Sequence, residues 1–316
     1  MALTKKLPSI LFHLHFRQKN ENKNSWQRNQ FGVPVIGCKC PVCTSCDPRD
    51  KRFRASAFIE SPAKIVIDTG PEFRLQCLRA GIDSLDAVLI THAHADHIFG
   101  LDDLRVFSHT KAVGFSTKLN TETEGPGLPI YVNERSFKII HETFSYIFTP
   151  TKEGGGKPKL NLIKNEIYTE KNPLKIGDLE IIPIPILHGS MNVSGYLLSE
   201  EKNGQKHSIA YLTDLNRIED SSVDLILRNA GILDHAIIDA LREREHSTHY
   251  SYDQALSLAN RLCPRHTWFT HMTHNASHVQ IQSYIDSHLS AFGNLQKIVL
   301  SGGSVAPSYD GLLLEI

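Results

Sequence analysis

Four side chains of metal-binding type lie within six residues of this chain, in the string His92-Ala-His-Ala-Asp-His97. The string follows the apolar run Ala87–Ile90, which we expect to form a buried strand, so the motif falls on the turn leaving that strand. A turn allows the side chains to face one point, whereas a regular strand or helix does not. Imidazole and carboxylate groups together suit Zn²⁺, Mn²⁺ or Fe at neutral pH. The alternative is a polar loop that is rich in histidine by chance.

Three more apolar runs end near a residue that could bind a metal. His188, Asp214 and His271 follow the runs at residues 179–186, 208–212 and 267–270, which we expect to be strands. A single histidine or aspartate after a strand is usually a loop residue. Four strand ends converging on one edge would instead form a metal site, and this joint pattern disfavours the chance interpretation of the motif at 92–97.

The remaining pattern predicts further strands and helices that would position these residues. We expect strands at 64–68, 130–132, 194–198 and 235–238, the last ending at Asp239. We expect helices at 72–80, 102–107, 134–143, 251–262 and 279–290, with Ser251 as an N-cap. Residues 111–129 and 154–156 are expected to be loops.

Length and composition limit the classes of protein to which this chain could belong. A chain of 316 residues with 41% hydrophobic residues is long enough for one α/β sandwich with a sizeable core. The 34 basic and 34 acidic residues balance, which disfavours charge-driven nucleic-acid binding. No run of 18 apolar residues occurs, so we expect no membrane span. Residues 17–30 are polar without a period, and we expect residues 1–30 to be disordered and residues 31–316 to form the domain.

The six cysteines do not form an evident disulfide pattern. Three of them have the metal-like spacing Cys38-x-Cys40-x2-Cys43, and the alternative is a set of free thiols. Cys46 lies outside this spacing. Cys77 and Cys263 are expected to be core residues. We therefore expect a reducing, cytoplasmic location.

Taken together, these residues resemble the metallo-β-lactamase superfamily, whose order of ligands they follow. The chain is more closely similar to the PhnP-like subfamily of cyclic phosphodiesterases, from residue 31 to the end. The strings that carry this likeness include Gly32-Val-Pro-Val-Ile-Gly37, Asp47-Pro-Arg-Asp-Lys-Arg52 and Thr270-His-Met-Thr-His274. The resemblance implies an αββα sandwich. Residues 1–30 depart from the family, so the first strand of the sandwich is left open, and we interpret this segment as a divergent start such as a frameshift would produce.

The resemblance also implies roles for individual residues. One metal would be held by His92, His94 and His188, and a second by Asp96, His97 and His271, with Asp214 bridging both. Asp68 would orient a ligand histidine, although an aspartate before Thr-Gly could simply form a turn. A closed structural zinc site would consist of Cys38, Cys40, Cys43 and His274. His249 would face the substrate and assist the leaving group, with His246 as its competitor.

The implied enzyme is a hydrolase of small phosphodiesters, with phosphoribosyl 1,2-cyclic phosphate as the best substrate. It would use two catalytic divalent metals, Zn or Mn, and one structural Zn. Two rivals from the same superfamily are a tRNA 3′-processing nuclease and a PqqB-like protein, and a zinc-stabilised binding module is the non-enzyme alternative. We expect no membrane partner and no extended nucleic acid, and leave a homodimer open.

Overall fold

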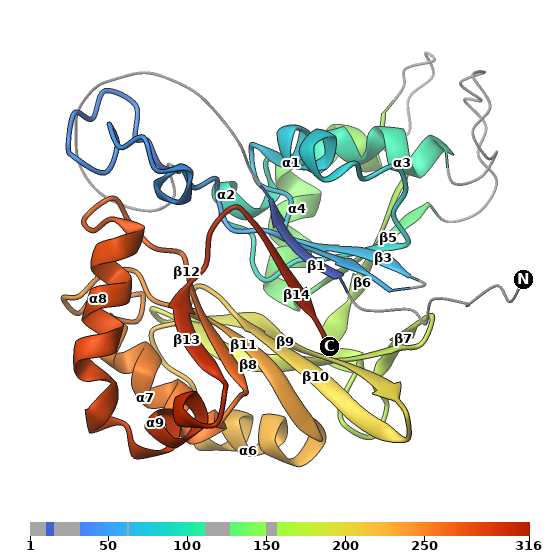
Figure 1. The fold of residues 1–316 in the computed structure, drawn as a ribbon. Coiled ribbons are helices and arrows are strands. Elements are labelled where there is room, and N and C mark those ends of the chain that lie inside the picture. Colours follow the sequence, from blue (N-terminus) through green and yellow to red (C-terminus); the bar gives the residue numbers. More distant parts are fainter. Residues whose placement is uncertain (1–10, 16–31, 62, 111–126, 150–156) are drawn as a thin grey trace, which may run out of the picture.

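The computed structural model describes residues 11–15, 32–61, 63–110, 127–149 and 157–316, which build two seven-stranded sheets (Figure 1). The first sheet contains, in spatial order, β14 (Gly311–Glu315), β1 (Leu11–His15), β2 (Ala57–Glu60), β3 (Lys64–Ile67), β4 (Ala87–Leu89), β5 (Leu128–Val132) and β6 (Leu160–Lys164). The second contains β13 (Ser304–Pro307), β12 (His266–Thr270), β11 (Ile232–Asp239), β10 (Gln205–Leu212), β9 (Met191–Lys202), β8 (Leu179–His188) and β7 (Leu174–Ile176).

Helices cover the outer face of each sheet, which confirms the predicted αββα sandwich (Figure 1). The first sheet carries α1 (Phe73–Ala80), α2 (Ala95–Ile98), α3 (Arg105–Thr110), α4 (Glu134–Thr143) and α5 (Ser145–Phe148). The second carries α6 (Asp220–Asn229), α7 (Tyr252–Leu262), α8 (His278–His288) and α9 (Gly293–Leu300). The predicted helix at 134–143 is confirmed in both bounds, and α7 begins at a capping box formed by Ser251 and Gln254.

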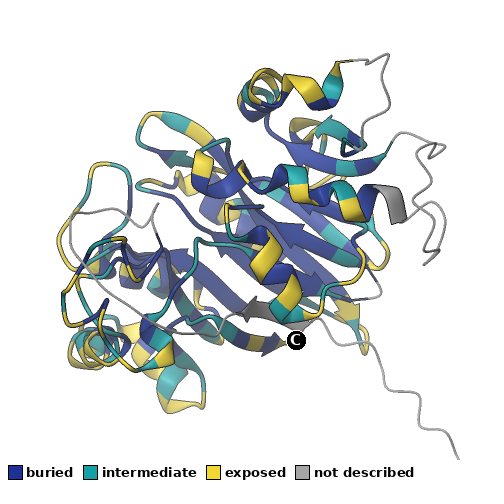
Figure 2. Ribbon diagram, turned by 90° about the horizontal axis from the view of Figure 1, so that it is seen from above, coloured by how far each residue is buried: buried dark blue, intermediate teal, exposed yellow. Residues whose placement is uncertain are grey.

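Both faces of the central strands are buried, which explains their continuous apolar runs. In β3, Ile65 and Ile67 belong to the core between the two sheets, whereas Val66 packs into the core beneath the helices of the first sheet. Figure 2 shows the buried strands in dark blue and helices whose outer faces are exposed. Each buried side chain of this size contributes about 1.5–3 kcal/mol to folding.

The strand directions bring the candidate site residues to one edge. Strands β3 to β6 are parallel to one another, as are β10 to β13. Strand β8 is antiparallel to β9, which is antiparallel to β10, so β8 and β10 run in the same direction. The carboxyl ends of β8, β10, β11 and β12 therefore meet at the same edge of the second sheet.

The amino-terminal segment departs from expectation at one place. Strand β1, Leu11–His15, is paired on both edges, antiparallel to β14 and to β2, so the expectation of disorder is wrong for these residues. Pairing of its backbone between two strands, rather than its local sequence, orders this segment. The rest of 1–30 lies outside the described residues, as do the expected loop at 154–156 and residues 111–126 of the loop expected at 111–129. The end of the latter prediction is wrong, because Leu128 and Pro129 pair with β6 as part of β5. Placing the domain boundary at residue 30 stays a prediction.

None of the helices within the described ranges has the length and apolar character that a membrane crossing requires.

Candidate metal centre

The candidate ligands lie at the ends of strands or in the segments that directly follow them. His92 and His94 follow β4, Asp96 and His97 lie in the short helix α2, and His188 ends β8. Asp214 and His271 follow β10 and β12 with left-handed φ values of 54° and 60°. Such a backbone conformation costs about 1–3 kcal/mol for a residue other than glycine, and it turns these side chains back toward one point. The sequence-predicted ligands are therefore brought together.

The ligands form two adjacent groups. In each group, every residue offers one donor atom, and these atoms lie within 4.8 Å of one another. The first group consists of His92, His94 and His188, and the second consists of Asp96, His97, Asp214 and His271. The groups touch, because the ring centroids of His92 and His97 are only 4.2 Å apart. This arrangement suits two neighbouring cations.

Carboxylate and carbonyl oxygens fix the orientation of two of these histidines. The Nδ1 atom of His97 donates to Asp68 Oδ2 at 2.7 Å, and the backbone N–H of Thr91 donates to Asp68 Oδ1 at 2.8 Å. The Nδ1 atom of His188 donates to the carbonyl oxygen of Thr248 at 2.8 Å. In both histidines, Nε2 is therefore free to act as the ligand atom.

The surroundings of one buried nitrogen atom show whether a metal ion would fit the second group. Nε2 of His97 is buried and has no hydrogen-bond partner among the described residues, although Asp214 Oδ2 lies 3.3 Å away. A buried polar atom without a partner costs about 1–3 kcal/mol. A divalent cation between His97 and the carboxylates would satisfy this atom, and nitrogen with carboxylate oxygen is the donor set that Zn²⁺ and Mn²⁺ accept. The residues fit the metal.

The electrostatics of the cluster favour the ligand forms of several groups. Burial and the neighbouring His97 hold the pKa of His92 well below its usual range, and burial lowers the pKa of His188 to about 4. Burial works against the charge of Asp214, but His271 and His97 outweigh it and hold the pKa of this carboxyl well below its usual range. Burial also opposes the charge of His271, but Asp214 raises the pKa of His271 to about 9. A cation would replace this proton on binding.

His249 lies beside the second group and is paired with a carboxylate. Its Nδ1 atom donates to Asp239 Oδ2 at 2.7 Å, and its ring stacks on that of His271 with centroids 4.6 Å apart. The competing His246 is half-buried and contacts Thr248 instead. Sequence reasoning did not assign a role to Asp239, although it ends a strand just as the recognised ligands do.

The cysteine cluster forms a third group with His274. The Sγ atoms of Cys38, Cys40 and Cys43 lie 3.3, 3.4 and 3.3 Å from His274 Nδ1. A zinc ion with tetrahedral Cys and His ligands requires a sulfur–nitrogen separation of about 3.5 Å. Burial raises the pKa of Cys43 to about 12, so its thiolate requires a cation nearby. The predicted four residues are thus brought together in a geometry that fits zinc.

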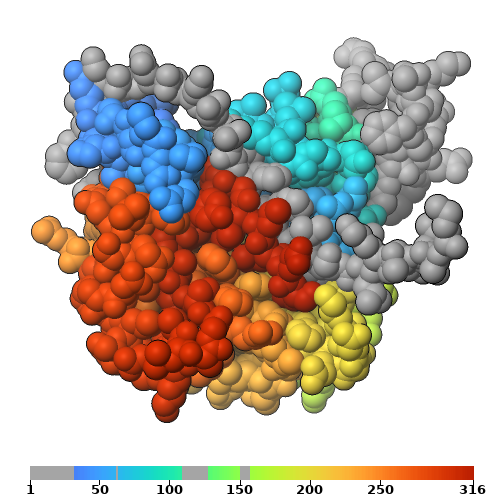
Figure 3. All heavy atoms as spheres, in the orientation of Figure 1, coloured from blue at the N-terminus to red at the C-terminus, as the bar shows by residue number. Residues whose placement is uncertain are grey.

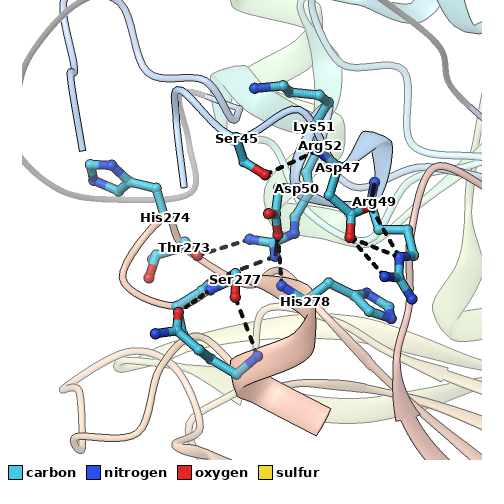
Figure 4. Close-up of polar contacts among 12 residues, drawn as sticks. Ser45, Asp47, Arg49, Asp50, Lys51, Arg52, Thr273, His274, Ser277 and His278 are labelled. Carbon is cyan, nitrogen blue, oxygen red and sulfur yellow. Dashed lines mark hydrogen bonds and ion pairs between the residues drawn. The ribbon is translucent and has the colours of Figure 1, made fainter. Parts of the chain in front are cut away.

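A buried ion pair ties the loop that contains the three cysteines to the segment on either side of His274. Arg52 contacts Asp50 at 3.4 Å and donates to the carbonyl oxygen of Thr273 at 3.0 Å. Asp50 in turn accepts from the backbone N–H of His278 at 2.6 Å (Figure 4). Figure 3 shows the loop, in blue, resting on the orange segment that contains α8. The loop is therefore held by contacts that do not involve sulfur.

The other cysteines lie apart from this cluster. Cys46 is exposed, and Cys77 is buried in the core beneath α1 as predicted. The expectation that Cys263 is a core residue is wrong, because it is exposed. It forms the left-handed C-cap of α7, one residue beyond Leu262, the last buried position of that helix.

Comparison with known proteins agrees with this geometry. The profile of the beta-lactamase superfamily domain matches residues 63–272. A crystal structure described as a new diphosphatase from the PhnP family is 31% identical, with a TM-score of 0.70, and the match covers 98% of this chain and 97% of that one.

Two relatives that are similar in sequence are named for activities other than that of a diphosphatase. An octanoyltransferase of Porphyromonas gingivalis is 33% identical over 273 residues, which are 85% of this chain but 49% of the relative, so the chain spans about half of that protein's length. A ribonuclease Z of Bradyrhizobium diazoefficiens is 35% identical over 100 residues, or 31% of each chain.

Proposed function

Because the chain belongs to the beta-lactamase superfamily, as a PhnP-like metal-dependent hydrolase, we propose that it hydrolyses a small cyclic phosphodiester, with phosphoribosyl 1,2-cyclic phosphate as the leading candidate. The observation that carries the proposal is the contact between two donor groups, one of three histidines and one of two histidines and two aspartates. A pair of cations is the arrangement that serves phosphoester hydrolysis.

In this proposal, His92, His94 and His188 would hold one ion and Asp96, His97 and His271 the other, and Asp214 would serve both. When bound, two divalent ions, Zn or Mn, would lower the pKa of a water molecule and withdraw charge from the phosphoryl oxygens. Cys38, Cys40, Cys43 and His274 would hold a structural Zn and would leave no ligand position for water.

The chain's own residues supply the remaining steps. Asp68 keeps the ring of His97 in position through the bond at Nδ1. Asp239 does the same for His249, so that a proton on Nε2 of His249 is presented to the oxygen of the departing alcohol. His249 is thus the proposed general acid. Its burial keeps bulk water from competing for that proton.

A diphosphate ester is the second candidate substrate, because the similar PhnP-family protein is described as a diphosphatase. Nuclease activity has weaker support, since the ribonuclease Z match covers 31% of the chain and the formal net charge is zero. A PqqB-like role or a binding module would leave the complete set of seven ligands unused. Octanoyl transfer is named for a relative of which the match covers only 49%, and the donor groups described above give no reason to propose that activity here.

The test is hydrolysis by protein loaded with Mn²⁺ or Zn²⁺. The substrates are a ribose cyclic phosphodiester, bis(p-nitrophenyl) phosphate, a nucleoside diphosphate ester and a precursor tRNA, with Asp214→Ala as the inactive control. We expect the first two to be cleaved. Preferential cleavage of the diphosphate ester or of the tRNA would replace the proposal with the corresponding alternative. Bound metal without cleavage of any of these would overturn the hydrolase proposal.

A further inference from the structure

We propose that Asn216 is a positioning residue, which fixes the loop carrying His249 against the turn carrying His188. This inference rests on the function proposed above and extends it to a residue outside the donor groups. Asn216 lies two residues after Asp214 and is half-buried. It is not among the candidate metal ligands.

The side-chain amide of Asn216 closes a circuit of three hydrogen bonds. The backbone N–H of Gly189 donates to Asn216 Oδ1 at 2.7 Å, and Asn216 Nδ2 donates to the carbonyl oxygen of Ser247 at 2.9 Å. The next carbonyl oxygen, that of Thr248, accepts from His188 Nδ1 at 2.8 Å. One amide therefore joins the residue after a candidate ligand to the loop that carries the candidate acid.

The partners define which way the amide points. An N–H requires an acceptor and a carbonyl oxygen requires a donor, so only one orientation of Asn216 satisfies both Gly189 and Ser247. An aspartate in this position would keep the bond to Gly189 and face Ser247 with a second acceptor. A leucine, which has a similar shape, would lose both bonds.

The base of Asn216 is itself fixed. Its backbone N–H donates to the carbonyl oxygen of Leu187 at 2.9 Å, and Leu187 donates back to that of Arg217 at 2.9 Å. This isolated bridge holds Asn216 beside the end of β8. Because its backbone is held against β8, the side chain of Asn216 can hold the loop at Ser247 in place.

The loop depends on such contacts because it has little structure of its own. Residues 240–251, between β11 and α7, contain no helix or extended strand. The base of the loop is closed by the bond from Leu241 N to the carbonyl oxygen of Tyr250, at 2.9 Å. Near its tip, a Cβ added at Gly189, where φ is +62°, would lie 3.2 Å from Thr248 Cγ2, so turn and loop are in close contact. Asn216 and His188 anchor this tip.

The expected consequence concerns mainly proton delivery. If the loop shifts, Nε2 of His249 no longer meets the departing oxygen and His188 loses the carbonyl that accepts from its Nδ1 atom, while Asp214 and His271, which follow β10 and β12, stay in place. Loss of a group that orients a metal-ligating histidine typically costs 10- to 100-fold in metal affinity or activity, and we expect a loss of that order for the group that positions His249. The loss should appear with an alkoxide leaving group, which needs a proton, and much less with p-nitrophenolate, which does not.

The experiment compares Asn216→Asp and Asn216→Leu with wild type and with Asn192→Asp. Asn192 is exposed and pairs with Leu187 in the β8–β9 register, so it controls for a new charge near the site. Substrates are a 2′,3′-cyclic nucleotide and bis(p-nitrophenyl) phosphate. We expect kcat on the cyclic nucleotide, measured with saturating metal, to fall about 10- to 100-fold in both Asn216 variants, with KM and aryl-ester hydrolysis little changed. Equal losses on both substrates, or no loss, would overturn the proposal.

A second readout separates this inference from the proposed function. Amide hydrogen exchange of residues 247–250 should accelerate in both Asn216 variants and remain unchanged in Asn192→Asp. If wild type cleaves no phosphodiester, the proposed function is wrong, and the exchange result still decides the role of Asn216. Exchange at the wild-type rate in Asn216→Leu would refute the positioning role, whatever the activity.

Discussion

His249 Nδ1 lies 2.7 Å from Asp239 Oδ2, and both side chains are buried. The pair repeats the relation between His97 and Asp68, where the same atoms are also 2.7 Å apart. Asp68 follows a strand of the first sheet and Asp239 ends a strand of the second. Each sheet thus contributes one buried carboxylate that holds a histidine of the centre.

Replacing Asp239 with asparagine should disable His249 without removing metal. We expect Asp239→Asn to lower kcat about 10- to 100-fold on a diester with an alkoxide leaving group, because the amide has no negative charge and can turn an N–H group toward Nδ1, which favours the wrong tautomer of the ring. The matched control is Asp234→Asn, on the same strand, whose partner His207 lies 2.7 Å away and outside the donor groups. Steady-state kinetics with metal analysis provides the measurement, and wild-type kcat in Asp239→Asn would contradict the role.

Removing Asp214 should empty the paired site and spare the cysteine site. We expect about three metal ions per chain in wild type and about one in Asp214→Ala, with hydrolysis lost. Elemental analysis of dialysed protein measures this. His246→Ala is the control, because that histidine lies outside the groups of candidate ligands. Two or fewer ions in wild type would argue against the cysteine-bound zinc.

Cys43→Ser should lose one zinc ion and lower the melting temperature, because zinc binding contributes directly to folding free energy at such sites. The control is Cys46→Ser, in which the replaced thiol is exposed. Thermal unfolding with and without a chelator measures the difference. The chelator should reduce the gap between wild type and Cys43→Ser, and equal melting temperatures before its addition would exclude a structural ion.

The ion pair between Arg52 and Asp50 should matter for stability. We expect Arg52→Met to destabilise the protein by about 3–5 kcal/mol, because it leaves the carboxylate of Asp50 buried without its positively charged partner. Arg49→Met breaks the more exposed pair with Asp47 and should cost at most about 1 kcal/mol. Urea unfolding at neutral pH compares the two, and similar values would show that the buried pair has no special role.

His278 should make the protein sensitive to mild acid. Burial, with Arg49 and Arg52 nearby, lowers its pKa to about 4. In the unfolded chain the pKa is about 6.5, so between these values the unfolded state binds more protons and stability falls as pH decreases. The effect is at most about 3 kcal/mol.

His278→Asn should remove this contribution and flatten the stability profile between about pH 6.5 and pH 4. Loss of zinc at low pH affects both proteins equally, so the difference between their unfolding free energies isolates the histidine. Parallel profiles over this range would show that His278 is not responsible.

Local sequence determined the elements and the candidate ligands. The string from His92 to His97 and the spacing of Cys38, Cys40 and Cys43 place several donors within one turn, where chain connectivity alone keeps them close. The helix at 134–143 was predictable in both bounds because its cap and apolar period are local features. Strand ends at His188, Asp214 and His271 were visible as changes from apolar to polar residues.

Other features depend on contacts between distant parts of the chain. Strand β1 is ordered by pairing with β14, about 300 residues away in sequence, and Arg52 bonds to Thr273 across 221 residues. The prediction that Cys263 lies in the core was wrong because this residue forms the C-cap of α7, and the cap rather than burial decides where its side chain lies.

The sequence alone thus determined which residues could bind metal and which superfamily the chain resembles. Only the tertiary structure decided that Asp239 holds His249 and that Asn216 ties its loop to the turn after β8. The physical reason is that a hydrogen bond depends on distance and direction in space. Neither is encoded by residue type, so such partners emerge only when the strands and loops are packed together.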